Sequence, residues 1–198
     1  MLNRLPLALV LALALAVGVA ACGEDEDEGS GGTATTTAES MMLSLTGEET
    51  VLVLDPGTAD VLTENKVTVE PVAPARPSGD GIGFPITGGA VGSESLAGTI
   101  DHSGGLVFSA GGTEVEVTDF VIDTEAGTLT ATTGGAELPL LNVDLSGLER
   151  SDEGGAIVLE GITTTLTADA AAALNDAFGV KLFEEGLTIG DVTVTATA

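Results

Sequence analysis

The feature that most constrains the fold is a series of short β-branched runs that recur from about Ser44 to the end of the chain. Gly, Asp and Pro interrupt these runs about every ten residues, which is the spacing of strands in an antiparallel sheet protein. In the segment 113–118, Val115 and Val117 fall on one face and Glu114 and Glu116 on the other. The sequence therefore predicts a mainly β domain, an antiparallel sandwich or a barrel-like sheet, over residues 47–198.

Ten segments have the composition of strands. They are Val51–Leu54, Val67–Pro71, Ile82–Ile86, Gly98–Asp101, Leu106–Ser109, Thr113–Ile122, Thr128–Thr132, Glu137–Asn142, Ile157–Thr164 and Thr188–Thr195. In the sixth segment, Phe120 and Ile122 have the opposite parity from Val115 and Val117. This change predicts either a bulge near Asp119 or burial of both faces beyond it.

One or two short helices are expected among these strands. Thr167 is a suitable N-cap for a helix over Ala168–Phe178, Asp169 lies near the positive end of its dipole, and Gly179 follows its last residue. A second, shorter helix is expected over residues 58–63.

The charge of the chain excludes several classes of function. It carries 31 Asp and Glu against five Lys and Arg, a formal net charge of −26, and it has neither Trp nor Tyr. Phosphate backbones therefore meet no cationic surface, and we expect no nucleic-acid partner. Most carboxylates must be solvated and mutually repulsive, which suits either a saline habitat or a basic or cationic ligand.

The first residues have the pattern of a lipoprotein leader. Arg4 precedes an apolar run from Leu5 to Ala21, and the run ends in the lipobox Val19-Ala20-Ala21-Cys22. Cys22 is the only cysteine, so its expected role is lipidation and not disulfide formation. We expect residues 1–21 to be removed and acyl chains on Cys22 to hold the protein at the outer face of the cell membrane. The alternative is an uncleaved signal anchor, which also places the rest of the chain outside the cytoplasm.

Residues 22–46 are expected to tether the domain to this anchor. They begin with five consecutive acids, Glu24 to Glu28, and continue with Gly and Thr without apolar periodicity. Such a polyanion lacks the preformed oxygen cage of a calcium site, so we expect a solvated linker and no metal site.

Several segments together resemble the haem-transport-associated domain, HtaA, of actinobacterial cell-envelope proteins. The core of the resemblance is His102-Ser103-Gly104-Gly105-Leu106. The segments that carry it are Gly98–Ser109, Val117–Asp123, Gly127–Ala131, Leu140–Ser146 and Leu166–Phe183. The resemblance covers residues 82–194 and implies a β-rich envelope domain that captures haem and passes it to a transporter.

The resemblance also implies a ligand set for iron. In HtaA domains a tyrosinate usually ligates the iron and a nearby histidine assists it, and His102 stands at the position of that histidine. This chain has no tyrosine, so His102 is the sole conventional iron ligand of the domain and our candidate haem-contact residue. The other interpretation of His102 is a plain turn or hydrogen-bonding role.

Catalysis is not expected. Asp101, His102 and Ser103 include the residue types of a nucleophilic triad, but neighbours on a strand point to opposite faces and do not converge. One histidine and one lipidated cysteine are too few for a catalytic zinc site.

These observations lead to one functional hypothesis and one alternative. The hypothesis is an extracytoplasmic lipoprotein whose HtaA-like domain is a non-catalytic binding or accessory module. Its expected partners are the membrane, through Cys22, and haem or haem-carrying envelope proteins. The alternative is a structural envelope module that contacts other proteins and has no small-molecule ligand. The oligomeric state stays open at this stage.

Overall fold

Thirteen strands and two helices make up residues 41–198, the part of the chain that the computed structural model describes. Eight of the strands form a closed antiparallel barrel. Around the ring they are β5 (Gly81–Gly92), β2 (Gly47–Leu54), β13 (Thr188–Thr197), β12 (Ala156–Leu166), β10 (Ala136–Asp144), β9 (Thr128–Thr133), β8 (Thr113–Asp123) and β6 (Gly98–His102), which pairs with β5. The predicted antiparallel β architecture is confirmed, in its barrel form.

Five further strands extend this ring. They are β1 (Met42–Ser44), β3 (Thr68–Val72), β4 (Arg76–Ser78), β7 (Gly105–Ala110) and β11 (Glu149–Glu153). β1 and β4 pair with β5, β11 pairs with β12, and β3 and β7 form a ribbon that continues from β8.

All ten predicted strands are present, and the three that sequence reasoning missed are β1, β4 and β11. These are short edge strands that bury little: all five residues of β11 are exposed. Their segments lack the apolar alternation that identified the other strands. β1 and the buried Leu45 lie inside the segment 22–46 that we assigned to the tether, so regular structure begins before residue 47.

The predicted bulge is confirmed at Asp119. Its φ is 53°, and the register of β8 against β9 shifts between Thr118 and Val121. β6 and β7 run end to end along β8, with the break between them opposite this bulge. On one side of the break β6 pairs with β5, a strand of the barrel, whereas on the other side β7 pairs with β3, which is outside the ring. The part of β8 that pairs with β7 therefore extends beyond the barrel.

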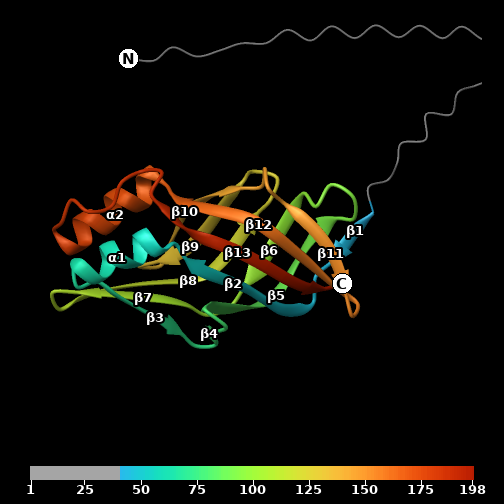
Figure 1. Ribbon diagram of the computed structural model, residues 1–198, viewed down its shortest axis with the longest axis horizontal. Coiled ribbons are helices and arrows are strands. Elements are labelled where there is room, and N and C mark those ends of the chain that lie inside the picture. Colours follow the sequence, from blue (N-terminus) through green and yellow to red (C-terminus); the bar gives the residue numbers. More distant parts are fainter. Residues whose placement is uncertain (1–40) are drawn as a thin grey trace, which may run out of the picture. The chain divides into compact units, whose positions relative to one another are not determined.

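The two helices, α1 (Pro56–Glu64) and α2 (Ala168–Phe178), lie at the same end of the barrel (Figure 1). The predicted capping of α2 is confirmed: the Thr167 hydroxyl accepts the Ala170 N–H at 3.1 Å, and Gly179 ends the helix with φ 65°. α1 starts two residues earlier than expected, because Pro56 occupies its first turn and Asp55 caps it.

The interior of the barrel is apolar, and its most deeply buried large side chains include Ile100, Ile162 and Val194. Within residues 41–198 no helix is both long and apolar enough to cross a membrane. The predicted leader, the lipobox with Cys22 and the first part of the tether lie outside the described residues.

Candidate functional site

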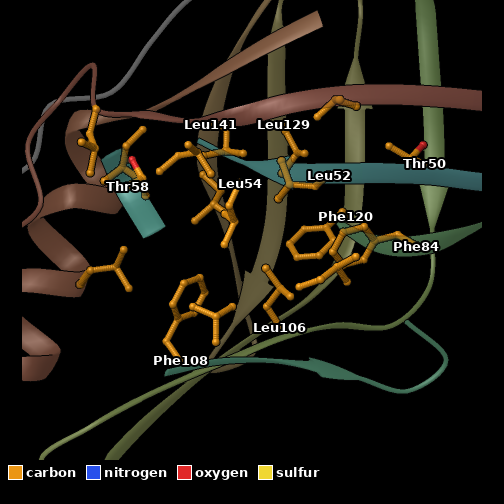
Figure 2. Close-up of a pocket in the computed structure, with 18 of the residues that line it drawn as sticks. Thr50, Leu52, Leu54, Thr58, Phe84, Leu106, Phe108, Phe120, Leu129 and Leu141 are labelled. Atoms are coloured by element: carbon orange, nitrogen blue, oxygen red, sulfur yellow. The ribbon is translucent and has the colours of Figure 1, made fainter. Parts of the chain in front are cut away.

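A cavity of about 80 Å³ lies inside the barrel at the end that carries the helices. Residues from all eight barrel strands, from β3 and β7 and from both helices line it, and 19 of its 22 lining residues are apolar. Figure 2 shows Leu106 and Phe108 on one side of the space and Leu52 and Leu54 on the other. Phe84 and Phe120 meet edge to face beside it, with ring centroids 5.0 Å apart.

The three polar residues in the lining do not make it polar. The Thr58 hydroxyl donates to the backbone carbonyl of Thr188, and the Thr50 hydroxyl bonds to Nε2 of His102. Because these groups satisfy one another or the backbone, no polar atom of the lining is exposed to the cavity. The space is therefore dry and apolar, and water has no hydrogen-bond partner in it.

His102 is the last residue of β6, and its side chain is buried in the wall of the cavity with 5% exposure. Its Nδ1 is 3.0 Å from the carbonyl oxygen of Phe120, which only accepts, so Nδ1 carries the proton and donates. In the neutral ring Nε2 then accepts from the Thr50 hydroxyl at 2.7 Å. Both ring nitrogens are engaged, and the tautomer is set by the backbone of β8.

Burial lowers the pKa of His102 below its ordinary value, because the apolar wall disfavours the charged ring. The Phe120 carbonyl and the Asp101 carboxylate act in the opposite direction but more weakly. The imidazole is therefore neutral at physiological pH. The hydrogen-bonding role that we had considered for His102 is present in the structure.

We infer that the mouth of the cavity lies where β2 and β5 stop pairing. β2 pairs with β5 only from Glu49 to Leu52, and the ribbon of β3 and β7 has turned away from the ring. Six side chains that line the cavity are only half-buried and surround this opening: Leu54, Val69, Ile82, Phe108, Leu187 and Ile189. An apolar ligand that enters here meets apolar side chains from five strands and from the segment before β13.

Sequence reasoning located part of this site. His102 lies in the cavity wall, whereas Cys22 lies outside the described residues. Thr50 was missed, because the strand was expected to begin at Val51. Its signal was present in the alternation of Thr50, Leu52 and Leu54, which all line the cavity. Among residues 41–198 no group of three His, Cys, Asp or Glu side chains is arranged to hold a metal ion.

Comparison with known proteins gives a fold and no sequence relative. No family model matches the chain, and no curated protein matches its sequence. The solved C-terminal domain of HtaA from Corynebacterium glutamicum matches with a TM-score of 0.56 and 14% identity, over 78% of this chain and 98% of that domain. The N-terminal domain of the same protein matches with a TM-score of 0.52 and 16% identity, over 77% of this chain and 98% of that domain.

At identities this low the comparison speaks for the fold alone. It agrees with the resemblance found in the sequence, which rested on the segments around His102 and on the Leu166–Phe183 helix. The domain in residues 41–198 has the fold of the HtaA domains.

Proposed function

We propose that the protein is an extracytoplasmic lipoprotein, anchored by acyl groups on Cys22, whose HtaA-fold domain is a non-catalytic module that takes up an apolar small molecule. The lipobox and the single cysteine support the anchor. The observation that carries the binding role is the dry cavity inside the barrel, with a mouth formed by apolar side chains. The interior of an eight-stranded barrel is either filled by its own side chains or has room for one small ligand.

The non-catalytic part of the proposal is supported by the surroundings of His102. Its two nitrogens bond to Thr50 and to the backbone of Phe120, so neither contacts the neighbouring Asp101 or Ser103. The residue types of a triad therefore stand side by side in sequence without forming a relay in space.

Haem is the specific ligand that the HtaA resemblance implies, and the cavity in its present form does not fit it. Its volume of about 80 Å³ is well below the ~300–1,000 Å³ of ordinary cofactor pockets. The chain has no tyrosine, and Nε2 of His102 is occupied by Thr50. One feature favours an iron contact, since ligating histidines usually donate their other N–H to a carbonyl or carboxylate, as Nδ1 does here. Haem capture through His102 therefore stays a hypothesis.

The binding role is tested by methyl NMR on the mature-length chain from residue 22, with Cys22→Ser to prevent acylation. Toluene is a suitable probe, because a compact apolar cavity takes up such molecules. We expect saturable shifts of the Leu52 and Leu129 methyl groups, while those of the exposed Val53 stay in place. If the cavity methyl groups do not respond, the structural envelope module becomes the better interpretation.

A haemin titration of the same protein tests the narrower hypothesis. If His102 contacts the iron, His102→Gln removes a saturable Soret shift, and Thr50→Val, which frees Nε2, retains or strengthens it. A Soret shift that is absent, or equal in the unchanged protein and in His102→Gln, contradicts the iron contact and leaves the toluene result standing. Mass spectrometry of the native protein tests acylation at Cys22 separately.

A further inference from the structure

We propose that the cavity binds a single hydrocarbon chain, the acyl or alkyl chain of an uncharged lipid, which enters between Leu54 and Phe108. This inference rests on the proposed uptake of an apolar molecule and names its chemical class. It follows from the extent of the cavity along β2, its volume and its chemistry.

The cavity extends along the inner face of β2. Thr50, Leu52 and Leu54 all line it, and four strand steps of about 3.3 Å separate the first from the last, so its wall runs for roughly 13 Å along β2. Its volume of about 80 Å³ is small beside the ~300–1,000 Å³ of ordinary cofactor pockets. A small space that extends this far along one strand suits a slender chain better than a flat macrocycle.

The lining selects for hydrocarbon. No polar atom is exposed to the cavity, so a hydroxyl, amide or carboxylate inside it loses its hydrogen bonds to water without replacement. The polar end of a ligand must therefore stay at the mouth, where Leu54 and Phe108 are half-buried.

The charge of the domain selects for an uncharged head group. Residues 41–198 carry 25 Asp and Glu against four Lys and Arg. A carboxylate or phosphate at the mouth is repelled by this field, whereas an alcohol or ester is not.

The test uses a series of straight-chain 1-alkanols on the mature-length chain from residue 22 with Cys22→Ser, followed by methyl NMR. We expect saturable shifts at Leu52 and Leu129. The affinity should rise about fourfold per added methylene and then level off once the cavity is full. The alkanoate of equal length should bind more weakly than the alkanol at low salt, and the difference should shrink as salt is added.

A matched pair of variants locates the binding. Leu54→Trp places an indole in the mouth, whereas Val53→Trp places the same side chain on the outer face, where Val53 is 41% exposed. We expect Leu54→Trp to weaken 1-octanol binding at least tenfold and Val53→Trp to leave it unchanged. The chain-length series on the protein without either substitution carries the test even if Leu54→Trp fails to fold.

Three results overturn the inference. The first is toluene binding without alkanol binding, which leaves the proposed binding role intact. The second is an affinity that keeps rising with chain length and is equal in Leu54→Trp and Val53→Trp, as expected for adsorption on the surface. The third is the absence of any response to toluene and to alkanols, which removes the proposed function as well.

Discussion

The buried His102 makes the stability of the domain depend on pH in a predictable direction. It is the only histidine in the chain, so titration near pH 6.5 belongs to one side chain. Its pKa is lowered in the folded state, mainly by burial. In the unfolded chain the same ring takes up a proton at about pH 6.5. The unfolded state then binds more protons than the folded state, so the free energy of unfolding must fall as pH is lowered through this value.

The size of the effect has an upper limit. If the folded form stays neutral throughout, the free energy of unfolding falls by about 1.4 kcal/mol between about pH 7.5 and pH 5.5. Most of that loss lies below about pH 6.5, and it ends once the pH passes the folded pKa.

The assay is urea unfolding followed by far-UV circular dichroism, because the chain has no Trp or Tyr to serve as a fluorescent reporter. His102→Gln is the control, since its amide is neutral at every pH used. We expect the control to lose most of the pH dependence and the Thr50→Val variant to retain it. Equal slopes in the unchanged protein and His102→Gln, or a stability that rises as pH falls through about 6.5, would refute the reasoning.

Three further predictions concern stability; the first two are measured by the same urea unfolding assay, and the third by thermal unfolding followed by the same circular dichroism signal. Asn175→Ala should cost about 1–3 kcal/mol, because its side chain accepts two backbone N–H groups and donates to the Phe183 carbonyl in the segment after α2. Gly89→Ala should cost more than about 3 kcal/mol, since its φ is 112° and a Cβ would lie 2.2 Å from the Thr99 carbonyl oxygen. Gly134→Ala, whose φ is 57° in open space, should cost only about 1 kcal/mol, and equal losses at the two glycines would contradict this account. Raising NaCl from about 0.1 M to about 1 M should raise Tm by several degrees, because it screens the repulsion among the carboxylates.

The features of the fold that the sequence predicted are those set by local patterns of residues. The alternation around Val115 and Val117 marks a strand with one wet face, and the parity change at Phe120 marked the bulge at Asp119. Thr167 and Gly179 define the ends of α2 through groups that lie within a few residues of each other. Each of these features depends on neighbours along the chain, so it is visible in the sequence.

The cavity depends on partners that are far apart along the chain. Thr50 and His102 are separated by 52 positions and meet only because β2 and β6 both flank β5. An inward Leu at the end of β2 looks the same in a sequence whether it packs against another side chain or borders a void. The position of His102 beside a turn was therefore predictable, but its bond to Thr50 and its place in an apolar wall were not.

The cavity follows from the way β8 changes partners. In a complete eight-stranded barrel the side chains just fill the interior, or leave room for one small ligand. Here the bulge at Asp119 and the break at Gly104 lie opposite each other, and the Asp119 N–H donates to the Gly104 carbonyl at 3.1 Å. Gly104 has a φ of 84°, and a Cβ there would lie 2.5 Å from the backbone nitrogen of Ala75, so a larger residue would push the turn between β3 and β4 away. On one side of this point β7 and β8 diverge from the barrel. On the other side β6, with His102, remains part of the closed wall. The bulge at Asp119 and the break at Gly104 thus open the mouth and keep the imidazole buried.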